Sequence, residues 1–113
     1  MAKVIITPSL KEQIFKKFKQ ESIQVLTFLS QLQTNPQKGK KLSHVGGIVI
    51  KELKYGSFRF YFITDGHILK FGTDDELAML IIKFVRMSGK KNQQENINKI
   101  KNVLKSLGFK GFD

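Results

Sequence analysis

Two arginines stand out among the residues that could do chemistry. The chain has 20 lysines and arginines against 9 acidic residues, but only Arg59 and Arg86 are arginines. A guanidinium group offers a planar fork of donors that matches a phosphate or carboxylate, whereas an ammonium group is a point charge. Arg59 interrupts the apolar run 58–63. It is therefore either a rim residue whose end reaches water, or a cation held on a rigid strand because an anion binds there.

The chain has few residues suited to other kinds of catalysis. Cysteine is absent, which excludes disulfides, thiolate nucleophiles and zinc–thiolate sites. His44 and His67 could exchange protons near neutral pH, but both lie in turn-like segments, where a structural or solvated histidine is expected. Together with the acidic run 74–76 they lack the spacing of a metal site. There is no phosphate-binding glycine motif and no Ser-His-Asp arrangement, so we expect neither a metal nor another cofactor.

The net charge of +11 indicates anionic partners. An excess of this size attracts polyanions and speeds their encounter with the protein, so we expect nucleic acid or an acidic protein. A lysine-rich surface also arises from biased composition, and the charge alone does not choose among these explanations. The apolar runs are too short to cross a bilayer and no secretory leader is recognisable. We therefore expect a cytoplasmic protein without a membrane partner.

The central part of the chain predicts a rigid scaffold for the arginines. Segments 48–54 and 58–63 are β-branched and aromatic, and the tripeptide 55–57 between them predicts a hairpin turn. Alternation along the second strand separates Phe58, Phe60 and Phe62 on one face from Arg59, Tyr61 and Ile63 on the other. Asp65-Gly66 predicts another hairpin turn, with 67–71 as the return strand or an extension of the hairpin. The run 77–86 favours a last buried strand, although its length also suits a helix.

Helices are predicted on both sides of this strand region. Residues 3–7 form a strand candidate, and Thr7-Pro8 then begins a helix, because proline in the first turn loses no hydrogen bond. A second helix runs from about 21 to 34 and ends before Pro36. A third begins near Asn92 and ends at Gly108. The order predicts one α+β domain, residues 1–113: a small twisted antiparallel sheet with an N-terminal helical hairpin and a C-terminal helix.

This order, with several short motifs, resembles the RelE/ParE superfamily of toxins from toxin–antitoxin systems. The resemblance covers nearly the whole chain. It rests on Thr7-Pro-Ser-Leu10, on Asn35-Pro36 with the following Gly-Lys-Lys-Leu42, and on the hairpin 50–61 with its glycine and arginine. The segment 84–91, Phe-Val-Arg-Met-Ser-Gly-Lys-Lys, precedes a helix that carries Gln and Glu. It is most similar to the HigB-like, phage-derived branch.

The resemblance implies a function. Members similar to RelE and HigB are metal-independent endoribonucleases that cut mRNA, usually on the ribosome, and an acidic antitoxin with an extended tail neutralises them. We therefore expect an mRNA interferase that acts without a cofactor, as a monomeric toxin within a toxin–antitoxin complex. ParE-like members share the fold but poison DNA gyrase. A gyrase inhibitor, or an inactive relative that binds antitoxin or nucleic acid, remains the alternative.

The resemblance also implies catalytic residues. RelE-like enzymes use lysines and arginines on an open sheet face to make the RNA's own 2′-hydroxyl attack its phosphate. Arg59 matches the hairpin arginine, which would hold the scissile phosphate, and Arg86 matches the basic residue that would stabilise transition-state charge. Lys51 and Lys54 lie near the family's basic pair, and one with a lowered pKa could be the general base. Two edge lysines with solvated ends explain them equally well.

The remaining candidates would contact bound RNA. They are Lys40 and Lys41 of the basic loop 37–41, Tyr55, Lys90 and Lys91. Solvated loops explain these lysines too. The chain departs from the family in lacking the C-terminal tyrosine that some RelE enzymes stack on the base. It also has Glu52 where a basic residue is expected, and Tyr61, the other tyrosine of the hairpin, is better explained by packing.

Overall fold

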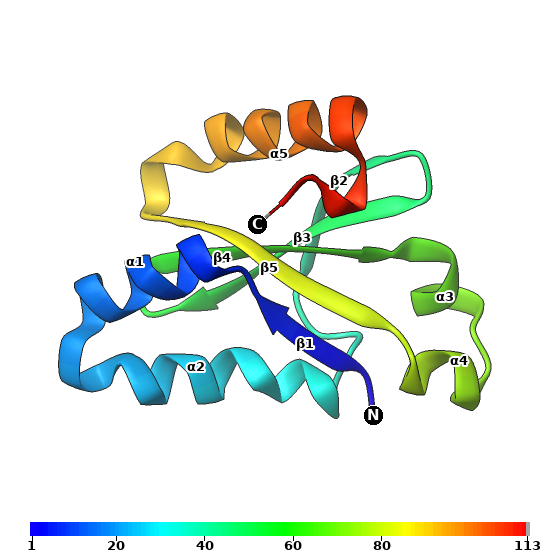
Figure 1. Ribbon diagram of the computed structural model, residues 1–113, viewed down its shortest axis with the longest axis horizontal. Coiled ribbons are helices and arrows are strands. Elements are labelled where there is room, and N and C mark those ends of the chain that lie inside the picture. The colour runs from blue at the N-terminus through cyan, green and yellow to red at the C-terminus, as the bar shows by residue number, and fades with distance from the viewer. Residues whose placement is uncertain (113) are drawn as a thin grey trace.

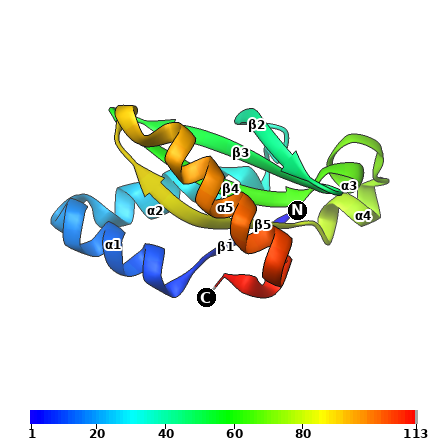
Figure 2. The ribbon, with the colours of Figure 1, turned by 90° about the horizontal axis from the view of Figure 1, so that it is seen from above.

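The chain folds into a five-stranded sheet between two helical layers, as the computed structural model of residues 1–112 describes it. Figures 1 and 2 show α1 (Pro8–Phe18) and α2 (Ser22–Ser30) on one face of the sheet and α5 (Gln93–Leu107) across the other. The strands are β1 (Lys3–Ile6), β2 (Lys40–Val45), β3 (Ile48–Tyr55), β4 (Phe58–Asp65) and β5 (Ile81–Ser88). The predicted α+β fold is confirmed.

The sheet has the order β1-β5-β4-β3-β2. Strands β2 to β5 pair antiparallel, whereas β1 adds to β5 in parallel and makes the sheet mixed. The predicted β3–β4 hairpin is present, but β3 extends one residue further than predicted, so that Tyr55 pairs opposite Phe58. β2 begins inside the segment predicted to be a basic loop, so Lys40 and Lys41 belong to an edge strand.

The N-terminal helices begin near the predicted positions. The Thr7 hydroxyl accepts a hydrogen bond from the backbone N–H of Leu10 at 3.4 Å, and Pro8 occupies the first helical turn. α2 is shorter than predicted, because after Ser30 the chain continues as a 3₁₀ turn, Gln31–Gln33. The two helices thus form the predicted hairpin.

The segment after β4 differs from the prediction. Asp65 does not begin a hairpin turn; its carboxylate accepts from the backbone N–H of Ile68 at 3.0 Å and caps α3 (Gly66–Phe71). The predicted return strand 67–71 is therefore helical, because an aspartate can cap a helix as readily as it begins a turn. A second short helix, α4 (Asp74–Ala78), follows with a capping box between Thr73 and Glu76.

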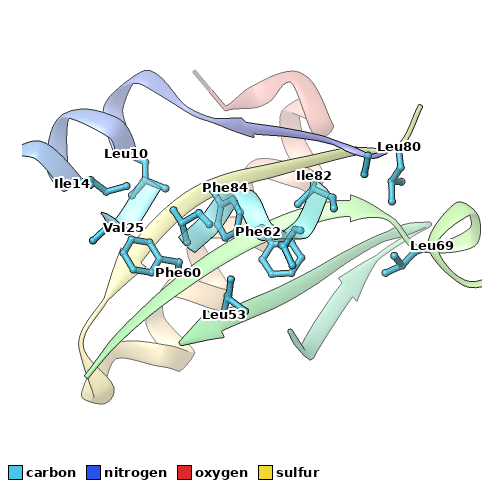
Figure 3. Close-up of a cluster of buried hydrophobic side chains, with 13 residues drawn as sticks. Leu10, Ile14, Val25, Leu53, Phe60, Phe62, Leu69, Leu80, Ile82 and Phe84 are labelled. Atoms are coloured by element: carbon cyan, nitrogen blue, oxygen red, sulfur yellow. The ribbon is translucent and has the colours of Figure 1, made fainter. Parts of the chain in front are cut away.

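Two apolar cores lie on the two faces of the sheet. Figure 3 shows the larger one, where Phe60, Phe62 and Phe84 pack against α1 and α2. On the other face, Tyr61 and Ile63 pack with α5 residues. The alternation predicted for β4 is therefore confirmed, and it places Arg59 on the face that α5 covers.

A bulge in β5 determines where Arg86 points. Phe62 lies opposite Phe84 and Tyr61 opposite Arg86, so Val85 is an extra residue in the strand. Val85 packs with Tyr61 in the core beneath α5. Because residues directly opposite each other share a face, Arg86 lies on the same side as Tyr61. The bulge thus turns Arg86 to the face that also carries Arg59.

Candidate functional site

The structure brings the two arginines together at the hairpin end of the sheet. Arg59 lies opposite Ser88, and Arg86 lies opposite Tyr61 two residues further along the same strand pair. All four side chains therefore share the α5 face as direct or diagonal neighbours. We call these four residues together with Glu52 the arginine cluster.

Glu52 is the acidic centre of this cluster. Arg59 Nη1 donates to both carboxylate oxygens at 3.1 Å, and Gln93 Nε2 of α5 donates to Oε1 at 2.9 Å. The Glu52 side chain is 1% exposed and that of Arg59 is 19% exposed. Arg59 Nε is buried without a hydrogen-bond partner among residues 1–112. The ion pair is therefore largely removed from water. Removing one partner would leave the other charge buried and unpaired, which is costly.

α5 also orients Arg86. Arg86 Nε donates to Asn96 Oδ1 at 2.7 Å, and Asn96 Nδ2 donates to the carbonyl of Asn92 at 2.7 Å. Asn96 is buried, whereas Arg86 remains partly exposed. The amide thus fixes the guanidinium plane from one side, and the side chain keeps contact with the surface. Of the two arginines, Arg86 is the better placed to meet an external anion.

Tyr61 lies beneath the charged groups. Its ring is fully buried, and its hydroxyl forms a hydrogen bond of 2.7 Å with the Ser88 hydroxyl. Burial raises the pKa of the Tyr61 phenol above its usual 10.0, the Ser88 bond lowers it, Glu52 raises it, and the two arginines lower it. The phenol therefore stays protonated at neutral pH and can act as a donor.

Four exposed lysines surround the arginine cluster. Lys40 lies opposite Glu52 and Lys54 opposite Arg59, so both share the α5 face. Lys90 and Lys91 are exposed in the 3₁₀ turn Lys90–Asn92, which joins β5 to α5. The cluster thus has one buried carboxylate, two guanidinium groups and a basic rim.

The other predicted site residues lie on the opposite face, which corrects their assignment to one site with the arginines. Lys51 and Lys41 lie opposite each other in the β2–β3 register, one position out of phase with Glu52. Tyr55 packs edge-to-face against Phe28 and bonds through its hydroxyl to Glu21. Alternation along β3 is the physical reason, because neighbouring residues of a strand point to opposite faces.

No metal site accompanies the cluster in the described part of the chain. Among residues 1–112, no three His, Asp or Glu side chains gather in a way that could hold a metal ion. His44 is exposed on β2, and the His67 ring lies 5.3 Å from that of Phe71 in α3. No helix in residues 1–112 has both the length and the apolar character needed to span a membrane.

Sequence reasoning missed the residues that hold the arginines in place. Glu52 stood out only as an acidic residue at a position where a basic one was expected. Counting back across the tight hairpin would have placed it diagonally opposite Arg59 on the same face. Gln93 and Asn96 carry no such signal, because their contacts depend on how α5 crosses the sheet.

Comparisons of this chain with protein-family models, with curated proteins and with solved structures gave no match. The function therefore has to be inferred from the arginine cluster, the charge around it and the motifs of the chain. Two guanidinium groups beside a carboxylate and a protonated phenol suit the binding of an anion and the transfer of protons next to it.

Proposed function

We propose that this protein is a RelE-like toxin of a type II toxin–antitoxin system, an endoribonuclease that cleaves mRNA without a metal ion. The observation that carries the proposal is the arginine cluster: the chain's only two arginines share one end of one sheet face with Glu52. The order of elements, with β1 and a helical hairpin before the antiparallel strands and a helix after them, is the order that the resemblance to RelE-like proteins implies.

The residues of the cluster could supply each step of such a cleavage. The 2′-oxygen of RNA attacks the adjacent phosphorus and the bond to the 5′-oxygen breaks, which leaves a 2′,3′-cyclic phosphate and a 5′-hydroxyl. Arg86 and Arg59 would neutralise charge on the phosphorane. Glu52, the cluster's only carboxylate, would accept the 2′-hydroxyl proton. The protonated Tyr61 would return a proton to the leaving oxygen through Ser88.

The surroundings fit polyanionic partners. Lys40, Lys54, Lys90 and Lys91 are exposed around the cluster, and the chain carries a net charge of +11. Such a surface would guide mRNA to the cluster, on the ribosome or off it, and would attract an acidic antitoxin. We propose a cytoplasmic protein that is a monomer within the toxin–antitoxin complex.

One observation favours a second candidate, a non-enzymatic binding module. Glu52 is engaged by both Arg59 and Gln93 and is 1% exposed, so RNA could reach it only if the first turn of α5 moved. A ParE-like gyrase inhibitor, or a relative that only binds antitoxin or nucleic acid, needs no such movement. In that case the arginine cluster would be structural.

Inducible expression of the wild type beside Arg86→Ala tests the proposal. Arg86 is preferred to Arg59 because removal of Arg59 would leave Glu52 charged and buried. Lys105→Ala is the matched control, because it removes one positive charge from an exposed position of α5 remote from the cluster. We expect growth arrest and new mRNA ends with the wild type and Lys105→Ala, and neither with Arg86→Ala.

Purified protein and synthetic RNA in the presence of a chelator separate the two candidates. Cleavage that leaves a 2′,3′-cyclic phosphate supports the nuclease. RNA binding without cleavage, equal in the wild type and Arg86→Ala, supports the binding module. Growth arrest with intact mRNA and broken DNA would contradict the nuclease and favour gyrase as the target.

A further inference from the structure

A second cluster of cations lines a pocket on the opposite face of the sheet. The pocket has a volume of about 420 Å³ and lies between the 37–41 segment, β3 and α3. It is lined by Gln37, Lys41, Val49, Lys51, Gly66, Leu69 and Lys70. Three of these residues are lysines and none is acidic, so the pocket combines a high positive charge with the apolar side chains of Val49 and Leu69.

Lys51 is the unusual residue of this pocket. It is 6% exposed, and its ammonium group donates to the carbonyl of Gln37 at 3.1 Å and lies 5.8 Å from the Phe62 ring centroid. Within residues 1–112 it has no ion-pair partner. An ammonium group has three donors, and burying it with so little compensation is unfavourable. Burial accordingly lowers the pKa of Lys51 below its usual 10.5.

The neighbouring Lys41 increases the cost of burying the Lys51 charge. Lys41 lies directly opposite Lys51 in the β2–β3 register, and like charges in that arrangement destabilise a sheet. Lys70 borders the same pocket from α3. A ligand with two negative charges would offset the repulsion among Lys41, Lys51 and Lys70, whereas the single carbonyl oxygen of Gln37 does not.

The pocket is preformed. Gly39 has a φ of +104°, and a Cβ there would lie 2.9 Å from the Phe62 ring, so only glycine lets the loop approach this closely. That approach brings the Gln37 carbonyl to Lys51. The Gln37 side chain then donates to the carbonyl of Leu69 at 2.5 Å, which links the loop to α3.

We propose that this pocket binds a small phosphorylated molecule, whose phosphate contacts Lys51, Lys41 and Lys70 and whose apolar part rests on Val49 and Leu69. A phosphate monoester carries about 1.5 to 2 negative charges at pH 7 and so matches three ammonium groups better than a single carboxylate does. The volume lies within the range of small-molecule sites, roughly 300–1,000 Å³. Because the pocket faces away from the arginine cluster, the proposal does not depend on the RNA-cleavage function.

The test uses phenyl phosphate as the probe, titrated into the full chain at constant ionic strength and followed by calorimetry and by the side-chain resonances of Lys51. Inorganic phosphate and benzoate are the comparison ligands. We expect saturable binding of phenyl phosphate, tighter than that of either comparison ligand. Lys51→Met should weaken binding about tenfold to a hundredfold, since it removes a charged hydrogen bond.

Two further variants guard against misfolding. Lys105→Met removes an exposed lysine of α5, on the other face of the sheet, and should bind as the wild type does. Lys70→Gln changes an exposed residue at the edge of the pocket and should weaken binding without affecting the fold. Equal affinity in wild type, Lys51→Met and Lys70→Gln, non-saturable binding, or benzoate binding as tight as phenyl phosphate would each overturn the proposal.

Discussion

Removal of Arg59 should show how strongly the protein depends on its buried ion pair. Arg59→Met deletes the charge but keeps a long apolar stem, and it leaves the Glu52 carboxylate with only the amide of Gln93. Because Glu52 is 1% exposed, water cannot replace the lost partner. Removal of one member of a buried pair costs about 3–5 kcal/mol, a large share of the roughly 5–15 kcal/mol that stabilises a domain.

Urea denaturation gives the measurement. With a dependence of about 1–3 kcal/mol per molar urea, this loss lowers the midpoint by about 2 M. The double variant Arg59→Met/Glu52→Gln removes both charges, so it should be about 2 kcal/mol more stable than Arg59→Met alone. The exposed Glu12–Lys16 pair on α1, with side chains 68% and 77% exposed, is the internal control and should show a coupling of about 0.2–0.5 kcal/mol.

Two results would refute this reasoning. One is a loss below about 1 kcal/mol for Arg59→Met, which is the range of surface pairs. The other is a coupling between Arg59 and Glu52 no larger than that between Glu12 and Lys16. Either would mean that water reaches Glu52 in solution and that Gln93 does not keep the first turn of α5 closed over it.

Three further outcomes follow from single residues. Lys51→Met should be more stable than the wild type at neutral pH. In urea denaturation, the difference in free energy of unfolding between the two proteins should narrow as the pH approaches 10.5. Over this range only the folded state, whose Lys51 pKa is lowered, loses its proton. Burial raises the pKa of Tyr61, so above pH 10.0 the unfolded phenol ionises first. Stability should therefore fall with rising pH in this range, less steeply in Tyr61→Phe. Gly39→Ala, strained at a φ of +104° and against the Phe62 ring, should lower the melting temperature, whereas Gly89→Ala, with open space around it, should not.

Local chemistry made the hairpin and the helix starts predictable. Alternation alone separated Arg59 from Phe58 and Phe60, because a strand allows only two directions for a side chain. Proline at position 8 has few helical positions open to it, so α1 was predictable from two residues. Asp65 was ambiguous, because the same side chain that begins a turn also caps a helix, and 67–71 is too short for periodicity to decide.

The arginine cluster was only half predictable. The family resemblance assigned both arginines to one site, but the β5 bulge that turns Arg86 towards α5 leaves no trace in the sequence. Lys51 was grouped with the arginines through the family resemblance, whereas alternation along β3 places it on the face opposite to Glu52. Gln93 could not be assigned, since its contact with Glu52 depends on the packing of an entire helix.

The parallel pairing of β1 has a consequence for the order of events during synthesis. Lys3 pairs with Ile81, so β1 has no partner until β5, the last of the five strands in sequence, has been synthesised. At about 5–20 residues per second this delay lasts several seconds. During that time β1 has no partner strand, whereas β3 and β4 can already pair and offer Phe60 and Phe62 to the α1–α2 hairpin. The five-stranded sheet can therefore be completed only after β5 has been synthesised, and its last step is a long-range contact between β1 and β5.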